Sequence, residues 1–599
     1  MAARYRWKHR SSPRILPVTP YAPPSADQLL AITVNAGIAD LAASERFAAA
    51  EPDLVEAIVE GVGQFAAGEF APLNRVGDVE GARLENGVVR LPDGFEAAYQ
   101  HFIEQGWNAI SGPAEFGGQG LPFTLACNVL ENLGAANMAF TLLPILSVGA
   151  IDALDHHGSS EQKARYLPKL VSGEWSGTMN LTEPQAGSDL GALRATATPI
   201  TEGEHAGKYR IAGQKIFITW GEHELSRNII HLVLARLPDA PAGSRGISLF
   251  VVPKYLVDAD GQPGPRNDLR CVSLEHKLGI NASPTCVMMF GDGASGGECI
   301  GEMVGVPNGG LKAMFTMMNS ARINVGNQGV QIAERATQQA LSYARERVQG
   351  ARAGAADRTP VAIIEHPDVR RTIIRMKALT EAVRALLYYT AGQVDRGALG
   401  DEAAARRAEV LVPLLKAWGT DIGVEVASLG IQVHGGMGFI EETGAAQHWR
   451  DSRIAPIYEG TNGIQAADLV TRKLELDGGE VLLDLLADVA REAVGSEKAL
   501  AALATDCSEI ARWMRGAAVE DRLAGSVPFC TIAAVAVAGW QMLRQMRAVE
   551  DGAAPALAAS KPVTARFFLD RIVPEARGLH DSAVAGAGLL YSLTADQLA

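Results

Sequence analysis

The stretch Arg450–Gln465 reads RDSRIAPIYEGTNGIQ and places the carboxylate of Glu459 between an apolar approach and the expected start of a helix. The apolar residues that follow recur at three- and four-residue spacing, at Ile464, Ala467, Val470 and Leu474. This spacing predicts a helix over residues 461–474 with Thr461 or Asn462 as its N-cap. The start of the helix therefore fixes the direction of the acid.

An acid held beside Ile454, Ile457 and Tyr458 loses contact with water, which raises its pKa toward neutrality and makes it a useful base. The commoner role of a glutamate at a helix start is to complement the helix dipole. Both interpretations of Glu459 remain open at this point.

Three further stretches combine small residues with hydroxyl or amide groups. Met179–Asp189 (MNLTEPQAGSD) offers backbone N–H groups beside small side chains, so that a flat ring or a phosphate can approach closely. Gly213–Gly221 (GQKIFITWG) is typical of a strand that ends in Thr219, and the paired glycines of Gln432–Phe439 (QVHGGMGF) allow the backbone to lie against a diphosphate. Each stretch also has an ordinary explanation, as a capped turn, a plain strand or a glycine-rich turn without a ligand.

Hydrophobic spacing divides the rest of the chain into helical and β-rich parts. Helical spacing dominates residues 25–169, 309–432 and the tail after Asp477. Short β-rich runs fill the interval between the first two of these parts. The predicted strands are Tyr209–Thr219, Ile229–Ala235, Gly246–Val252 and Thr285–Phe290. We therefore expect an α+β multi-domain protein, with an N-terminal helical domain (1–176), a β domain (177–303), a C-terminal helical bundle carrying the Glu459 loop (304–476) and an additional helical domain (477–599).

Composition limits the functions that the chain can serve. A length of 599 residues predicts several packed domains, and the net charge of -14 argues against a general surface for nucleic acid or anionic membrane. The six cysteines show no metal-ligand or disulfide spacing, so we expect no metal and a cytoplasmic protein. No run of apolar residues reaches the ~18 that a membrane span needs. A basic N-terminal arm, from Arg4 to Arg14, is read as a loose arm or as a transit peptide.

The four quoted stretches, in this order and flanked by helices, resemble the acyl-CoA dehydrogenase family. The resemblance covers residues 106–474, and the longer ends resemble its larger bacterial branch, which includes broad-range acyl-CoA dehydrogenases and 3-methylmercaptopropionyl-CoA dehydrogenases. It implies the acyl-CoA dehydrogenase fold with an extra C-terminal helical bundle, FAD as cofactor, and conversion of an acyl-CoA to its trans-2-enoyl form. Electrons would pass to an electron-transfer flavoprotein.

The resemblance also implies roles for particular residues. Glu459 matches the base that removes the α proton while flavin N5 takes the β hydride, and its backbone N–H, together with a ribityl hydroxyl of the flavin, polarises the thioester carbonyl. Some members carry the base at a position that here is Ala321, which cannot accept a proton. The matched flavin-contacting residues are Leu181, Thr182, Ile218, Thr219 and Thr461, with Ser188 near the flavin phosphates or the pantetheine arm. Substrate contacts are expected from Ser188, Arg322, Glu459 and Gly460.

Residues Arg347, Gln432, Gly435 and Gly436 match positions that reach the adenine-diphosphate end of a neighbouring subunit's FAD, which implies at least a homodimer. Acyl chain length stays open, from short substrates such as 3-methylmercaptopropionyl-CoA to medium or long fatty acyl-CoA. Two alternatives remain. One is an acyl-CoA oxidase that uses O2, and the other is a nucleic-acid-binding protein on the same fold, against which the mixed charges of the C-terminal tail argue.

Overall fold

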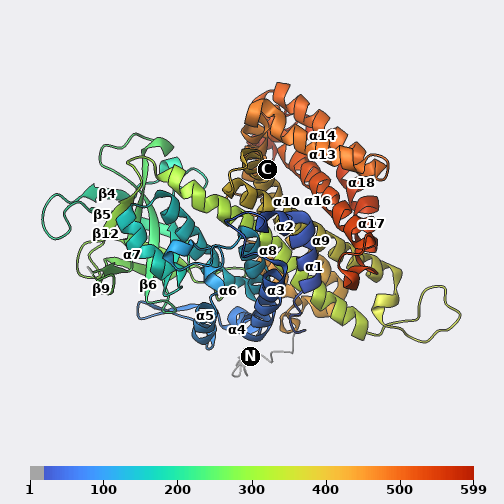
Figure 1. Cartoon of the computed structure of the whole chain (residues 1–599), viewed down its shortest axis with the longest axis horizontal. Helices are drawn as coiled ribbons and strands as arrows, with labels where there is room; N and C mark the ends of the chain where they lie inside the picture. The colour runs from blue at the N-terminus through green and yellow to red at the C-terminus, as the bar shows by residue number, and fades with distance from the viewer. Residues whose placement is uncertain (1–18, 259) are drawn as a thin grey trace, which may run out of the picture.

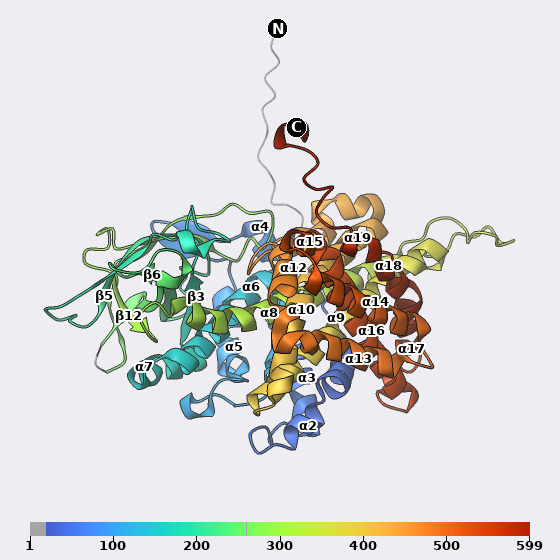
Figure 2. The same ribbon diagram turned by 90° about the horizontal axis from the view of Figure 1, so that it is seen from above.

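The computed structural model describes residues 19–258 and 260–599. A β layer occupies one side of the molecule, long helices cross its middle, and a further group of helices covers the other side (Figure 1 and Figure 2). The α+β multi-domain prediction is confirmed. The basic arm expected between Arg4 and Arg14 lies outside the described residues.

The N-terminal part is mainly helical, as predicted, with one short hairpin that the sequence pattern did not predict. Its helices are α1 Ser25–Ala31, α2 Ile38–Ala42, α3 Pro52–Phe65, α4 Ala71–Glu80, α5 Phe95–Glu104, α6 Phe123–His157 and α7 Ser160–Val171. The hairpin pairs β1 Arg83–Glu85 with β2 Val88–Arg90. Helix α6 breaks at Asn137, whose Oδ1 accepts a hydrogen bond from the Phe140 N–H at 3.2 Å and so starts the second half of the helix.

The central part is a β-sheet in the order β10-β11-β5-β12-β7-β6-β3, with β4 paired to β5 and β6. Its strands are β3 Trp175–Asn180, β4 Thr196–Pro199, β5 Tyr209–Thr219, β6 Asn228–Arg236, β7 Ile247–Pro253, β10 Leu269–Leu274, β11 Thr285–Phe290 and β12 Ile300–Val304, and β8 Tyr255–Val257 pairs separately with β9 Pro263–Arg266. The four predicted strands are present. Strand β3 was missed: its polar residues Ser176, Thr178 and Asn180 do alternate with Trp175, Gly177 and Met179, but the strand is short and both of its faces are buried.

Three long helices form the centre of the molecule: α8 Gly310–Glu346, α9 Pro367–Ala398 and α10 Glu402–His434. Glycines let α8 and α10 pack closely, because a Cβ on Gly329 would lie 1.9 Å from the Gly419 carbonyl oxygen. The short helices α11 Ala445–Ser452 and α12 Asn462–Thr471 follow, and the loop between them carries Glu459.

An additional helical bundle completes the chain, as the resemblance implied. Its helices are α13 Glu480–Ala493, α14 Lys498–Gly516, α15 Val519–Ala524, α16 Ser526–Glu550, α17 Lys561–Phe567, α18 Val573–Arg577 and α19 His580–Val584. Figure 2 shows this group lying alongside the central helices. A buried ion pair links the two layers, since the Lys561 ammonium lies 2.8 Å from Glu381 on α9 and 2.7 Å from Asp27 on α1.

Two helices of the described chain, α6 and α16, are long and apolar enough by average composition to span a membrane, although no run of consecutive apolar residues had indicated either. In the most apolar windows of these helices, 89% and 83% of the residues are buried inside the protein. Burial of this extent is typical of core helices, which are apolar on every face.

Candidate active site

A cavity of about 300 Å³ lies between the sheet and the central helices, and it brings together stretches that are far apart in the sequence. The loop after β3 contributes Leu181, Thr182 and Ser188, and the end of β5 contributes Ile218 and Thr219. The opposite wall is formed by Arg322 of α8 together with Glu459 and Gly460. Among the described residues that line the cavity, Glu459 carries the only carboxyl group.

Buried polar contacts hold the loop after β3 against β5. The Lys215 ammonium, on β5, lies 3.0 Å from the Leu181 carbonyl oxygen and 2.8 Å from the Glu183 carboxylate. The Glu183 carboxylate also accepts hydrogen bonds from the N–H groups of Arg194 and Ala195, at 2.6 and 3.0 Å. Because Lys215 and Glu183 are nearly inaccessible to solvent, this ion pair fixes the position of Leu181 and Thr182 beside Thr219. Sequence reasoning did not identify the Glu183–Lys215 pair.

The backbone of the Glu459 loop is unusual. Glu459 has φ +55° and Gly460 has φ +82°, two successive residues in the left-handed region that a glutamate rarely adopts. The Glu459 carbonyl oxygen accepts hydrogen bonds from Arg322 Nε and Gln465 Nε2, each at 3.3 Å. Thr461 caps α12, as predicted, because its hydroxyl accepts the Ile464 N–H at 3.2 Å. The surrounding contacts thus hold the acid in a strained conformation.

Burial raises the pKa of the Glu459 carboxyl above its ordinary value, and the charges of Arg322 and Lys416 oppose that rise. The first of the two interpretations of Glu459 is thereby favoured over a simple dipole-capping role. Ala321, the alternative base position, precedes Arg322 on α8 and is buried.

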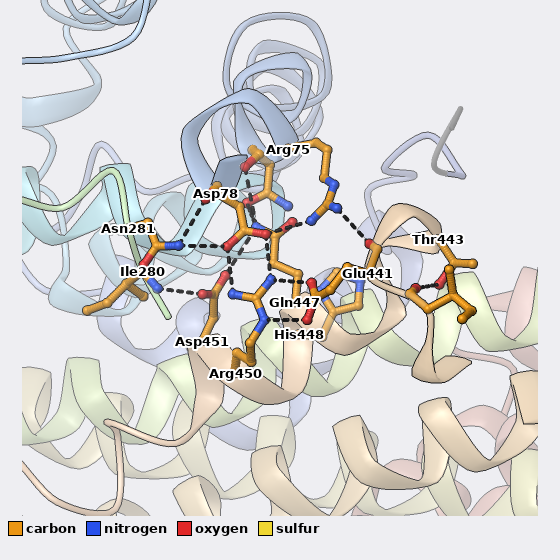
Figure 3. Close-up of polar contacts among 12 residues, drawn as sticks. Arg75, Asp78, Ile280, Asn281, Glu441, Thr443, Gln447, His448, Arg450 and Asp451 are labelled. Atoms are coloured by element: carbon orange, nitrogen blue, oxygen red, sulfur yellow. Dashed lines mark hydrogen bonds and ion pairs between the residues drawn. The ribbon is translucent and has the colours of Figure 1, made fainter. Parts of the chain in front are cut away.

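The start of the stretch Arg450–Gln465, which carries Glu459, is anchored by a polar cluster that joins three parts of the chain (Figure 3). The Arg450 guanidinium lies 2.6 Å from Asp78 on α4 and 2.9 Å from Glu441. Asp451 accepts a hydrogen bond from the Ile280 N–H, in the loop between β10 and β11. Burial, with the nearby Asp78 charge, raises the pKa of Asp451 to about 6. This junction connects α4, the β domain and α11, and it sets where the Glu459 loop begins.

Comparison with known proteins agrees with this arrangement. Family models described as acyl-CoA dehydrogenase N-terminal, middle and C-terminal domains match residues 53–174, 178–292 and 308–474, and an acetyl-CoA dehydrogenase C-terminal like model matches residues 480–594. The chain belongs to the acyl-CoA dehydrogenase family.

Relatives of this acyl-CoA dehydrogenase include a 3-methylmercaptopropionyl-CoA dehydrogenase of Ruegeria pomeroyi, 47% identical over 94% of this chain and 97% of the relative. The broad-specificity linear acyl-CoA dehydrogenase FadE5 of Mycobacterium tuberculosis is 33% identical over 81% of this chain and 84% of its own. Among solved structures, ACDH-11 of Caenorhabditis elegans in complex with C11-CoA has a TM-score of 0.75 and 19% identity, covering 96% of this chain and 95% of that one. The last comparison shows the fold.

Like its family, this acyl-CoA dehydrogenase is an FAD-dependent oxidoreductase that acts on acyl-CoA, and the cavity walls fit that cofactor. Thr182, Ser188 and Thr219 line the cavity, and their hydroxyl groups form no hydrogen bond with any described side chain or backbone group. A Cβ built on Gly187 meets nothing within 4 Å, so the wall leaves room for a planar ring. These hydroxyls are therefore free to bond to polar edges of the cofactor.

Several predicted residues do not line this cavity. Thr461 lies next to it but uses its hydroxyl as the cap of α12. Arg347, Gln432, Gly435 and Gly436 gather at the far end of α8, where the ring of Tyr343 stacks on His434 with centroids 4.5 Å apart. From Arg322 to Arg347 the helix rises by about 37 Å, at ~1.5 Å per residue. This second group is thus remote from Glu459 within one chain, and its role toward a neighbouring subunit's FAD stays a prediction.

Other lining residues were missed, notably Phe217, which is 58% exposed and has φ +60°. It lies in a β-bulge, because Cys286 and Met288 of β11 pair with Ile218 and Lys215, leaving one extra residue on β5. The bulge turns the aromatic ring toward the cavity, and no sequence signal marks it. The remaining missed residues are Leu146, Met179, Gly187, Leu190, Phe315, Met318, Ile464 and Arg472.

Proposed function

We propose that this chain dehydrogenates an acyl-CoA thioester between its α and β carbons, with Glu459 removing the α proton. The observation that supports the proposal most directly is the position of Glu459, whose buried carboxyl group is the only one that the described residues place on the cavity wall and whose pKa is raised by burial. A base is most effective when its pKa lies near the working pH, and burial moves a carboxyl group in that direction.

The α proton of a thioester is too weakly acidic for a carboxylate unless the carbonyl is polarised. The backbone N–H of Glu459 donates no hydrogen bond to any residue that the structure describes, so it is free to donate to the thioester oxygen. The left-handed conformation of Glu459 and Gly460 lets one residue offer both its carboxylate and its N–H to the substrate. Gly460 and Arg322 complete this wall.

Bound FAD would supply the acceptor for the β hydride. Leu181, Thr182, Ile218 and Thr219 would hold its ring system, with Ser188 near its phosphates or near the pantetheine arm of the substrate. Thr461 would contact it from the start of α12. The far-end residues Arg347, Gln432, Gly435 and Gly436 would reach the adenine-diphosphate part of a second subunit's FAD, so the working form would be at least a homodimer.

Among possible substrates we favour short acyl-CoA esters such as 3-methylmercaptopropionyl-CoA. The 47%-identical relative is named for that substrate, and two relatives of Syntrophomonas wolfei, 37% and 38% identical over 70% of this chain, are butyryl-CoA dehydrogenases. An electron-transfer flavoprotein in the cytoplasm would take up the electrons. Medium or long acyl-CoA, and oxygen as acceptor, are the competing possibilities.

The test is anaerobic bleaching of the flavin by a panel of acyl-CoA esters, with wild-type holoenzyme and Glu459→Gln side by side. We expect bleaching by short esters in the wild type and a loss of at least about 10³-fold in the variant, because glutamine cannot accept the proton. Bleaching of the variant at the wild-type rate would remove Glu459 as the base. Peroxide formed in air at the turnover rate would favour the oxidase.

A further inference from the structure

The four buried lysines of the described chain differ in their partners. Lys215, Lys254 and Lys561 each lie within 2.8 Å of a carboxylate. Lys416, on α10, is fully inaccessible to solvent and has no carboxylate partner at ion-pair distance among the described residues. Burying an ammonium group without an ion pair costs free energy, so the hydrogen bonds that Lys416 makes must offset part of that cost.

The two hydrogen-bond acceptors of Lys416 lie in the loop that carries Glu459 and at the first residue of the helix that follows it. Its ammonium donates to the Gly460 carbonyl oxygen at 2.8 Å and to Asn462 Oδ1 at 2.9 Å. Asn462 is itself oriented, because its Nδ2 donates to the Ala417 carbonyl at 2.9 Å and lies 3.0 Å from the Thr420 hydroxyl. The amide oxygen of Asn462 therefore points at Lys416. One side chain of α10 thus fixes the residue after the base and the first residue of α12.

The same ammonium acts on the Glu459 carboxyl through its charge. Around Glu459 the charged groups are Arg322 on α8 and Lys416 on α10, with Arg472 also on the cavity wall. Around Lys416 they are Glu459, Asp421 and Arg322. Burial lowers the pKa of Lys416 to about 8, with Glu459 opposing that change, so the ammonium is largely charged at neutral pH. Its positive charge favours the ionised form of Glu459.

We propose that Lys416 is a positioning residue for the reaction, which holds the left-handed turn at Glu459 and Gly460 and keeps the base ionised. This inference rests on the proposed role of Glu459. The backbone hydrogen bond and the charge are separable, because a glutamine at this position can still donate a hydrogen bond to Gly460, whereas a methionine supplies neither.

The experiment compares Lys416→Gln and Lys416→Met with wild-type holoenzyme, measuring the rate of flavin reduction between pH 5.5 and 9.5 (~0.5-unit steps). For Lys416→Gln we expect a rate about tenfold lower near the acid end, recovering toward the wild-type plateau at high pH, because Glu459 ionises later without the positive charge. For Lys416→Met we expect the same shift and a plateau that is also about tenfold lower, since the turn is no longer held. Lys277→Gln is the matched control, because Lys277 donates to a backbone carbonyl, that of Ser283, outside the cavity.

A second readout is independent of turnover. Infrared titration follows protonation of the Glu459 carboxyl directly, when the spectrum of each protein is compared with that of the same protein carrying Glu459→Gln. The titration should shift to higher pH in both Lys416 variants and not in Lys277→Gln. An infrared titration and a pH–rate profile that are both unshifted in Lys416→Gln would overturn the role of the charge. A wild-type plateau rate in Lys416→Met would overturn the role of the hydrogen bond to Gly460. Loss of FAD or of folding in Lys416→Met, with an unshifted Lys416→Gln, would reduce Lys416 to a structural residue. If Glu459→Gln itself bleached normally, the proposed function would fail, whereas its inactivity beside unshifted Lys416 variants would contradict only the present inference.

Discussion

Replacing Gly460 by alanine should slow the reaction much more than an equal backbone strain placed elsewhere. Gly460 has φ +82°, a conformation that costs a residue with a side chain about 1 kcal/mol. A Cβ there would lie 2.7 Å from Gln465 Nε2, so Gln465 must move and its 3.3 Å hydrogen bond to the Glu459 carbonyl is lost, at about 1 kcal/mol more. The sum is about 2 kcal/mol, and about 30-fold in rate if all of it falls on the geometry of the base.

Gly495→Ala is the matched control for this substitution. Gly495 has φ +89° and a Cβ there meets nothing within 4 Å, so it carries the backbone strain alone and lies in the loop between α13 and α14. Stopped-flow flavin reduction should be about 30-fold slower in Gly460→Ala and unchanged in Gly495→Ala, at equal FAD content. Equal rates in the two variants would show that the left-handed turn does not position Glu459.

Two further predictions concern the junction of Figure 3 and the far end of α8. The pKa of Asp451 is raised to about 6 from 3.8, so its contribution to stability is complete below pH ~3.8 and is lost as the pH rises through 6. In urea titrations at pH 8, the free energy of unfolding of Asp451→Asn should therefore exceed that of the wild type by up to about 3 kcal/mol, and at pH 5 by less. A difference between variant and wild type that is the same at both pH values would contradict this. Arg347→Ala should lose FAD on dilution while the flavin that remains bound is reduced at the wild-type rate, as ultrafiltration and stopped-flow measurements can show; a slower reduction of bound flavin would place Arg347 in the chemistry instead.

Local sequence patterns were sufficient to predict the strands and the helix cap that depend only on neighbouring residues. The observed bounds of β5 and β11 are those predicted from their β-rich runs, and the Thr461 cap followed from the pattern after Glu459. The convergence of Thr182, Thr219 and Glu459 on one cavity was predicted from a resemblance, since no short-range rule relates Glu459 to residues hundreds of positions earlier.

Features that depend on contacts between distant segments could not be predicted. Lys416 looks like an ordinary polar residue of a helix, but it is buried and donates a hydrogen bond to Gly460, in a loop that comes much later in the chain. Phe217 reaches the cavity because β5 holds one residue more than β11 opposite it, which is a property of the pair of strands. In both cases the decisive partner lies elsewhere in the chain.

The polar junction around Arg450 has a consequence for how the enzyme is made. Its members come from segments that a ribosome produces at widely separated times, since Gln447 bonds to Asn74, 373 positions earlier. The Glu459 carboxyl group therefore cannot reach the cavity on a nascent chain until nearly four-fifths of the polypeptide has emerged, and a prematurely terminated product that ends before α11 would contain every strand of the sheet but not Glu459.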